Sequence, residues 1–553
     1  MNKNNINKFT KNSIMVLIIY LVCGVFLIRH YQYEGLNANT IGYLTVALEY
    51  ARGNFYNAIN GFWPPLISWL IVPFLKLGMA PLLAGRIVMY ITGFFLLIGV
   101  RILTYRFELT EGVRNIILLV MVPITLGYIK VVFPDLLILV FIIFYLNIIF
   151  KNSYPDRISN GILSGVFGAL AYFSKHFAFP FFVSHFVIFN ALHYFRNSAV
   201  ESKKGVLRNA VIGMALFAII SGAWILLISS KYNYLTIGTA GKYNLALTSQ
   251  TLQAIPEFEG IEKGKEVDPV YYAGLLKPPY ETALSTWDDP TYVSEKILGK
   301  IKPWGSIKYI FRYVVTNAYR TMRIFVSFFS FLSTPILIIY ILFCIQPFSK
   351  LIEQGSMLYL LTTLVLYTGG NTLALVYIDT VRYLWIDNIL LLLMGGHVLT
   401  VLFRSEFFSG KTRKYVLTAF FVLSFIFIPL RDTFQKPSRG ENNFKIFRIL
   451  EDRYNIHGNI ASNDRWGDTL QLVYYLNLGK SDKDRWTYYY GMPKKNQTDE
   501  DLLKELKTHN IDYYIVWGDA GFLPGYEELT KGSVSDLKIY SLGSDHETKS
   551  DLH

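Results

Sequence analysis

Long apolar runs alternate with short polar connections along most of the chain. Each run has close to the roughly 20 residues that an α-helix needs to cross a bilayer. The runs cover 13–29, 82–105, 113–131, 133–151, 158–174, 177–195, 207–230, 321–346, 356–379, 381–403 and 414–431. This pattern predicts an α-helical polytopic membrane protein with about eleven transmembrane helices.

Two apolar stretches near the N-terminus need separate comment, namely the first span, 13–29, and the run 64–78, which is not counted among the spans. The first run follows a basic segment and ends without a small-x-small cleavage site, so we expect an uncleaved anchor. A further run, 64–78, is interrupted by Pro64, Pro65 and Pro73. Because proline breaks the interior of a helix, this run predicts a helix that lies along the membrane surface.

The positions of basic residues predict the orientation. With the N-terminus in the cytoplasm, the long polar segments 30–63, 231–319 and 432–553 all fall outside an inner (plasma) membrane. Connections on the cytoplasmic side then carry the positive charge, as the positive-inside rule requires. These basic residues are Lys151, Arg157, Arg196, Lys203, Lys204, Arg208, Lys350, Arg404, Lys411, Arg413 and Lys414.

Composition agrees with this picture. Hydrophobic residues make up 52% of the 553 residues and charged residues only 17%, with a mean hydropathy of +0.33. The formal charge of +13 is explained by the basic connections, so we expect no nucleic-acid partner. Cys23 and Cys344 both lie in apolar runs and form no disulfide framework or metal-binding spacing.

We expect two domains. Residues 1–431 would form the membrane domain, with outer loops 30–80 and 231–319 beside its site. The second loop is too long for a plain connection, and its prolines and tryptophans predict a folded cover. Residues 432–553 would form a small extracytoplasmic α/β domain. We predict strands at 459–462, 486–490, 512–517 and 537–540, and helices at 469–476 and 499–507, the latter capped by Thr498.

Polar positions at the outer ends of apolar runs are the candidate site. Asn39, Asp135, Lys175 and Arg382 share this feature, and ionisable groups at membrane depth are costly enough to suggest function. The three ionisable residues also have structural explanations. Asp135 would cap a helix, Lys175 would extend to the headgroups, and Arg382 would form an internal salt bridge with Asp379 or Asp387.

Further candidates surround these four. Glu34 is an alternative base, Tyr383 adjoins Arg382, and Asn37, Tyr43 and His176 are candidates for substrate contact, although His176 has a structural role as its alternative. Asp288 and Asp289 would ligate a divalent cation or form a paired-acid turn, and no other cofactor is indicated. Lysine and arginine together suit a phosphate, because both donate charge-assisted hydrogen bonds and offset the charge that grows on a departing phosphate. The sequence therefore predicts a polyprenyl-phosphate sugar as ligand.

Several short motifs resemble one enzyme class. They are Asn39-x-x-x-Tyr43-Leu44, Gly53-Asn54-Phe55, Pro64-Pro65-Leu66, Pro134-Asp135, Ala171 to Lys175, and Arg382-Tyr383. In order, spacing and side they resemble GT-C class membrane glycosyltransferases, in particular the protein-mannosyltransferase-like and aminoarabinose-transferase-like group. The resemblance implies an inverting transfer of a sugar from a polyprenyl phosphate. It also implies an acidic role for Asp135 and phosphate contacts for Lys175 and Arg382.

The sequence departs from this pattern at Asn39, where the resemblance implies an aspartate that acts as the base or positions it. A carboxamide cannot be a general base. Either Asp135 or Glu34 is the base, or the acceptor is already ionised, or catalysis is lost and the protein only binds the lipid. We predict a glycosyltransferase whose acceptor is a glycolipid, glycan or protein of the cell envelope. Membrane lipids are its other expected partners. A flippase for lipid-linked sugars and a non-catalytic lipid-sugar-binding protein are the alternatives.

Overall fold

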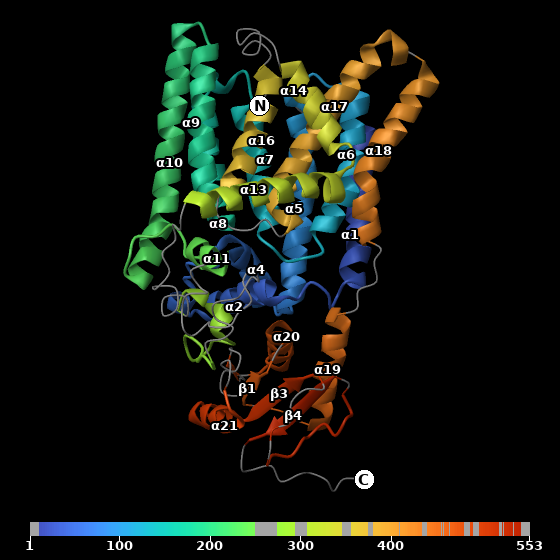
Figure 1. Ribbon diagram of the computed structural model, residues 1–553. Helices are drawn as coiled ribbons and strands as arrows, with labels where there is room; N and C mark the ends of the chain where they lie inside the picture. Colours follow the sequence, from blue (N-terminus) through green and yellow to red (C-terminus); the bar gives the residue numbers. More distant parts are fainter. Residues whose placement is uncertain are drawn as a thin grey trace. The chain divides into compact units, whose positions relative to one another are not determined.

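Figure 1 shows the computed structural model, which divides into two compact units. The helical unit comprises Met1–Gln32, Pro64–Gly238 and Ser306–Lys436, and the mixed unit comprises Tyr33–Trp63, Thr239–Gly305 and Pro437–His553. The structure describes residues 10–248, 274–292, 307–344, 355–373, 380–408, 410–433, 439–454, 456, 458–463, 465–480, 487–489, 497–518, 523, 525–534 and 536–542.

Apolar helices make up most of the helical unit. They are α1 (Lys11–His30), α4 (Leu66–Lys76), α5 (Pro81–Leu103), α6 (Glu111–Tyr128), α7 (Asp135–Ile149), α8 (Ile158–Ser174), α9 (Ala178–Arg196), α10 (Val200–Tyr232), α13 (Ile307–Ile324), α14 (Ser333–Cys344), α16 (Gly355–Leu373), α17 (Trp385–Arg404) and α18 (Lys411–Thr433). In the part of the chain that the structure describes, seven helices are long and apolar enough to cross a membrane, and a bent pair makes an eighth candidate. The prediction of a polytopic integral membrane protein is confirmed. Residues 374–379, the end of the expected run 356–379, lie outside the described residues.

One predicted span is wrong as a straight helix. Within the expected run 321–346, α13 and α14 are separated by a π-helical turn, Phe325–Phe329, and the pair is bent by 115°. The sequence of α13 is amphipathic. The exposed apolar residues Phe311, Val315 and Tyr319 recur every fourth position along one face, and Arg312 and Arg323 are also exposed. An amphipathic helix of this kind suits an interface better than a bilayer interior.

Helices α8 and α10 approach closely through glycine. An added Cβ at Gly165 would lie 2.3 Å from the backbone oxygen of Gly213, and one at Gly161 would lie 2.7 Å from that of Asn209. Apolar side chains gain little by associating in lipid, so close backbone packing between small residues is what holds membrane helices together. This contact positions the C-terminal end of α8, where Lys175 follows.

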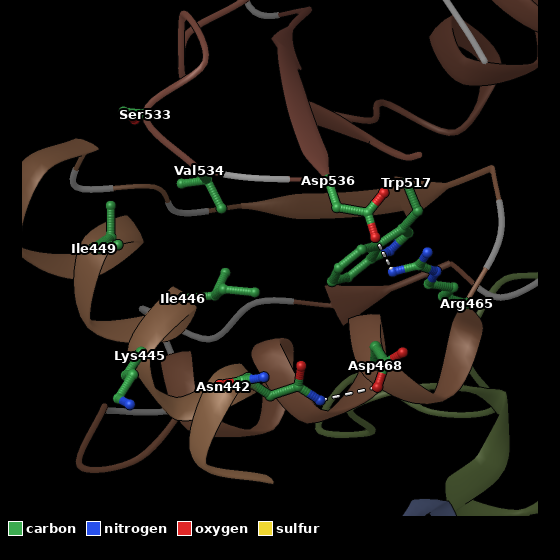
Figure 2. A pocket seen from close by; sticks show the side chains of 11 residues that line it. Asn442, Lys445, Ile446, Ile449, Arg465, Asp468, Trp517, Ser533, Val534 and Asp536 are labelled. Atoms are coloured by element: carbon green, nitrogen blue, oxygen red, sulfur yellow. Dashed lines mark hydrogen bonds and ion pairs between the residues drawn. The ribbon is translucent and has the colours of Figure 1, made fainter. Parts of the chain in front are cut away.

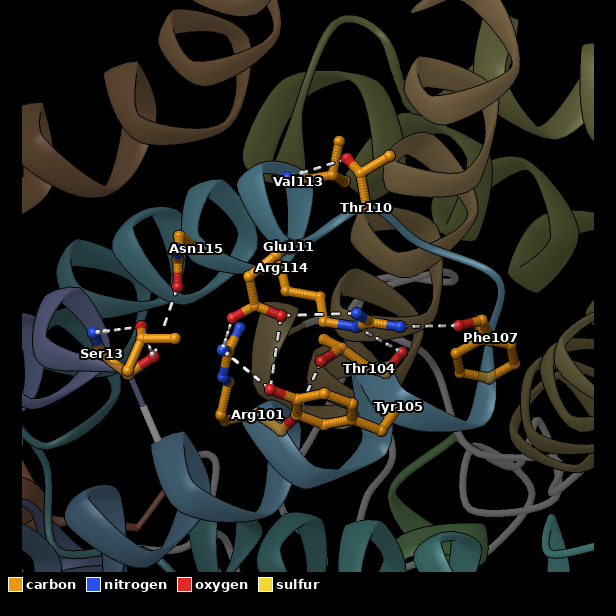
Figure 3. A network of polar contacts seen from close by, with 11 residues as sticks. Ser13, Arg101, Thr104, Tyr105, Phe107, Thr110, Glu111, Val113, Arg114 and Asn115 are labelled. Atoms are coloured by element: carbon orange, nitrogen blue, oxygen red, sulfur yellow. Dashed lines mark hydrogen bonds and ion pairs between the residues drawn. The ribbon is translucent and has the colours of Figure 1, made fainter. Parts of the chain in front are cut away.

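A polar network joins α5 to α6 (Figure 3). Glu111 accepts from the fully buried Arg101, and it also pairs with Arg114, whose Nη1 lies 3.4 Å from Glu111 Oε2. Arg101 and Arg114 also lie against the ring of Tyr105, at 5.1 and 4.4 Å. The network fixes the turn between the two helices. The basic residues of this turn were not among those that we used to predict the orientation.

Two basic residues, Arg106 and Arg208, join neighbouring segments at one end of the helical unit. Arg106, in the α5–α6 connection, donates to the backbone oxygen of Asn147 near the C-terminus of α7 (2.9 Å). Arg208 of α10 donates to the backbone oxygen of Pro155, in the connection between α7 and α8 (2.9 Å). Since α7 begins at Asp135, that residue lies at the opposite end of the helix from these basic groups.

The mixed unit contains a four-stranded sheet in the order β2-β1-β3-β4. Strand β1 (Asn459–Ser462) is parallel to β2 (Thr487–Tyr488) and to β3 (Tyr513–Trp517), and β4 (Leu537–Ser541) is antiparallel to β3. Helices α20 (Trp466–Leu476) and α21 (Asp499–Thr508) connect the parallel strands, and Thr498 caps α21 as predicted. Helix α19 (Arg439–Tyr454), which precedes the sheet, was not predicted.

Segments far apart in sequence share the interior of the mixed unit. The ring of Tyr33 stacks on Phe444 of α19 at 4.1 Å, and Tyr488 of β2 donates to the backbone oxygen of Leu284 (2.8 Å). Trp63 donates to the backbone oxygen of Trp287 (2.9 Å). These contacts bring parts of all three long polar segments into one unit.

The glycine contact between α8 and α10 yields a stability prediction. Gly165→Val would place a branched side chain against the backbone of α10, so it should lower the thermal unfolding midpoint of the detergent-purified protein. Overpacking of this kind costs about 1–3 kcal/mol. Gly222→Val is the matched control, because an added Cβ at Gly222 of α10 meets nothing within 4 Å. Equal midpoints for the two variants would contradict the proposed role of this contact.

Candidate functional site

An ion cluster of Asp135, Lys175 and Arg382 lies in the helical unit. Lys175 Nζ is 2.6 Å from Asp135 Oδ1, and Arg382 Nε is 3.6 Å from Asp135 Oδ2. The three residues are far apart in sequence, yet one carboxylate contacts both cations. The structure therefore brings together the three ionisable residues that the sequence singled out at helix ends.

Helix termini position each charge. Asp135 is the first residue of α7, after Pro134, and Lys175 is the C-cap of α8. Arg382 lies in a 3₁₀ turn, Val381–Leu384, that leads into α17. A negative group at a helix N-terminus and a positive one at a C-terminus are both stabilised by the helix dipole. These local effects add to the attraction between the charges.

Exposure differs sharply within the ion cluster. The side chain of Asp135 is 5% exposed, whereas those of Lys175 and Arg382 are 27% and 19% exposed. The carboxylate is therefore buried beneath two cations that retain contact with their surroundings. With one negative and two positive groups, the cluster keeps a net positive charge that suits an anionic ligand.

Aromatic rings support both cations. Lys175 Nζ lies 4.2 Å from the ring centroid of Tyr383, and the Arg382 guanidinium lies 4.0 Å from that of Phe133. Cation–π contacts of this kind favour a fixed position for each charge. Tyr383 was predicted to be at the site, but Phe133 was not, although its place directly before Pro134-Asp135 was a usable signal.

Neighbouring polar groups have other partners. Asp387 is fully buried and accepts from the hydroxyl of Thr368 (3.0 Å), so the described acid that pairs with Arg382 is Asp135. The other acid considered, Asp379, lies outside the described residues.

His176 packs beside Tyr172, with ring centroids 5.7 Å apart, and burial lowers its pKa to about 4. The His176 imidazole is therefore expected to be uncharged near neutral pH.

The candidates of the first loop belong to the mixed unit. Glu34 accepts from the backbone N–H of Gly440 and Glu441 (2.9 and 3.3 Å) at the start of α19. Asn37 is the N-cap of α2 (Ala38–Arg52), and its oxygen accepts from Thr40 N (3.1 Å). Both residues therefore have capping roles.

Two further residues of α2 complete the first-loop set. Asn39 is half-buried in the first turn of the helix. Tyr43 is buried and packs edge-on against Trp63, with centroids 4.9 Å apart. The contact of Tyr43 is one of core packing.

Asp288 and Asp289 stabilise a turn in the mixed unit. Both are buried. Asp288 accepts from Leu284 N (2.9 Å), and Asp289 accepts from Thr291 N (3.3 Å). Among the residues that the structure describes, no group of three or more histidine, cysteine or acidic side chains is arranged to hold a metal ion. The paired-acid turn considered from the sequence is thus present.

Comparisons with known proteins address the fold. No family profile and no curated protein sequence matches the chain. The oligosaccharyltransferase of Archaeoglobus fulgidus is similar in structure, with a TM-score of 0.50 and 11% identity over 91% of this chain and 68% of that one. The arabinofuranosyltransferase AftD from mycobacteria gives a TM-score of 0.45 and 12% identity over 96% of this chain and 42% of that one.

ArnT from Cupriavidus metallidurans, in a structure bound to undecaprenyl phosphate, gives a TM-score of 0.43 and 11% identity over 96% of this chain and 98% of that one. At such identities a structural likeness establishes the fold and nothing finer. The expected architecture is confirmed: the chain has the fold of the GT-C class of membrane glycosyltransferases.

Proposed function

We propose that this protein is a glycosyltransferase that moves a sugar from a polyprenyl-phosphate donor to an acceptor of the cell envelope, at the outer membrane face. The ion cluster carries the proposal, because it offers two partly exposed cations at fixed positions. Two such donors bind the phosphate of the donor lipid and stabilise the charge that develops on it as the sugar leaves. The GT-C fold is consistent with this chemistry.

The position of the ion cluster favours a transferase over a transporter. Transporters bind their substrates near the bilayer midplane, commonly between broken helices. Asp135, Lys175 and Arg382 instead lie at the termini of α7, α8 and the turn before α17. The predicted orientation puts this end outside, because the basic residues Arg106 and Arg208 lie at the other end of α7.

Asp135 is proposed as a positioning residue. Its carboxylate is buried, with one oxygen beside Lys175 and the other beside Arg382. It would hold the two head groups at the spacing that a phosphate requires. Of the alternatives left open by Asn39, this arrangement favours an acceptor that is already ionised, such as a phosphate, over a base at Asp135.

Transfer itself is the first test. Purified protein in nanodiscs would be incubated with radiolabelled polyprenyl-phosphate sugars and membrane lipids of the host. Consumption of one donor, with label appearing in an acceptor, is expected. Binding of donors without any transfer would contradict the enzyme assignment and support the lipid-sugar-binding alternative.

Lys175→Met tests the phosphate contact. A hydrogen bond to a charged group contributes about 1.5–3 kcal/mol, so its loss should weaken polyprenyl-phosphate binding by roughly 10–100-fold. Lys76→Met, at the exposed C-terminal end of α4, is the matched control and should bind normally. Unchanged affinity in Lys175→Met would exclude this role, provided that the variant unfolds at the wild-type temperature.

Asp135→Asn tests positioning. The amide cannot neutralise the two cations, so their geometry should loosen and transfer should fall by roughly 100-fold or more. Affinity for the lipid phosphate should change much less, since both cations remain. Asp156→Asn, at an exposed position in the connection between α7 and α8, is the control. Transfer at the wild-type rate in Asp135→Asn would refute the positioning role.

Asn39→Asp tests whether the reaction needs a carboxylate in the first loop. If the acceptor is already ionised, the added carboxylate has no proton to remove, and transfer should persist with a similar pH profile. A large rise in rate, with a new acidic limb in the pH profile, would instead show that proton removal limits transfer. Collapse of transfer in a folded protein would assign the amide a specific role.

A further inference from the structure

A cavity of about 670 Å³ lies within the mixed unit, between α19, the sheet and the loop that leads into β4 (Figure 2). Its volume is within the range of about 300–1,000 Å³ that is typical of small-ligand sites. None of the residues predicted from the sequence as site residues lines it. Transfer at the ion cluster makes no use of this cavity, which we call the β1–β3 cavity.

The topology of the sheet marks this place as a ligand position. Strand β1 is followed by α20 and by β2 on one side, and the chain then crosses through α21 to β3 on the other side. The strand order therefore reverses between β1 and β3, which are parallel. In open α/β sheets, ligands bind outside the carboxyl ends of the strands at such a reversal. Arg465 and Trp517, which line the cavity, lie at these ends.

The backbone at the cavity is strained. Arg465 has φ 47° and Asp536 has φ 63°, in the left-handed region that residues with a side chain seldom adopt. Arg465 Nη1 lies 2.6 Å from Asp536 Oδ2, and its guanidinium is 5.5 Å from the ring centroid of Trp517. Figure 2 shows the Arg465 and Asp536 side chains pointing toward each other beside Trp517. Strain of this kind concentrates at functional sites.

Charge at the cavity is balanced. Arg465 pairs with Asp536, and Lys445 pairs with Glu441 (2.8 Å) one helical turn earlier in α19. The buried Asp468 accepts from the amide of Asn443 (2.9 Å). The cations are thus already neutralised, unlike those of the ion cluster. A phosphate or nucleotide would find no excess positive charge here, whereas hydroxyl groups would find both donors and acceptors.

The cavity also has an apolar side. Ile446 and Ile449 of α19 line it together with Val534 and the ring of Trp517. The indole N–H of Trp517 donates to Thr469 (2.8 Å), so the ring is held in one orientation. A wall of apolar groups beside fixed amide and carboxylate groups complements a molecule with one C–H face and several hydroxyl groups.

We propose that the β1–β3 cavity binds a neutral saccharide. The C–H face of a sugar ring would lie against Ile446 and Val534, and its hydroxyl groups would reach Asp468 and Asn442. This site is independent of the proposed transfer, because its binding is measured directly and requires no reaction at the ion cluster.

Direct titration tests the proposal. Full-length protein in nanodiscs would be titrated with neutral methyl glycosides and disaccharides of glucose, galactose, mannose and N-acetylglucosamine, and with glucose 6-phosphate and AMP. Saturation-transfer NMR and calorimetry would report binding. At least one neutral saccharide should bind with a dissociation constant of about 1 mM or below, and the two anions should bind more weakly.

Variants locate the binding. Asn442→Trp would fill the cavity from an exposed position of α19, and Asp468→Asn would remove the carboxylate. Each should weaken binding at least about tenfold. Lys504→Trp, at an exposed position of α21, is the matched control and should bind as the wild type does. If Asp468→Asn lowers the unfolding temperature, its binding result is set aside, and the saccharide affinity of Asn442→Trp alone decides whether the cavity is the binding site.

Three outcomes would overturn the proposal. They are no binding by any saccharide of the panel, stronger binding of glucose 6-phosphate or AMP than of every neutral sugar, and saccharide binding that Asn442→Trp leaves unchanged. Failure of the transfer assay would not affect it. Conversely, loss of saccharide binding with transfer intact would leave the proposed function standing.

Discussion

A buried carboxylate that must be paired is the constraint on which the helical unit depends. Asp135 begins a helix of almost entirely apolar residues, where an isolated charge would be very costly. Lys175 and Arg382 satisfy it from two other helix ends, and each cation in turn rests on an aromatic ring. The termini of α7, α8 and α17 are thereby tied together. The close glycine contact of α8 with α10 extends this tie to a fourth helix.

The helices of the helical unit were largely predictable because bilayer thickness sets the length of an apolar run. The ion cluster was also predictable, since ionisable groups at membrane depth are costly and are almost always paired. The bend between α13 and α14 was not predicted. The expected run began only at 321, so the amphipathic residues 307–320, which belong to the same helix, were assigned to the preceding loop.

The first-loop residues show a different limit. Asn37 accepts a hydrogen bond from a backbone N–H three residues further along the chain, and Glu34 accepts from backbone N–H groups that only the fold brings near. A sequence cannot distinguish an acid that caps a helix from one that contacts a substrate, because both need the same side chain at a chain reversal. In the case of Glu34, the helix that it caps lies some 400 residues further along the chain. Helix α19 itself was overlooked because it is predominantly polar.

The composition of the mixed unit has a consequence for biosynthesis. Its pieces come from residues 33–63, 239–305 and 437–553, so they leave the ribosome at widely separated times. Trp63 must wait for Trp287, in the second piece, and Tyr33 must wait for Phe444, in the third. Chains truncated before residue 437 would therefore present unburied aromatic surface, which is the kind of surface that chaperones recognise.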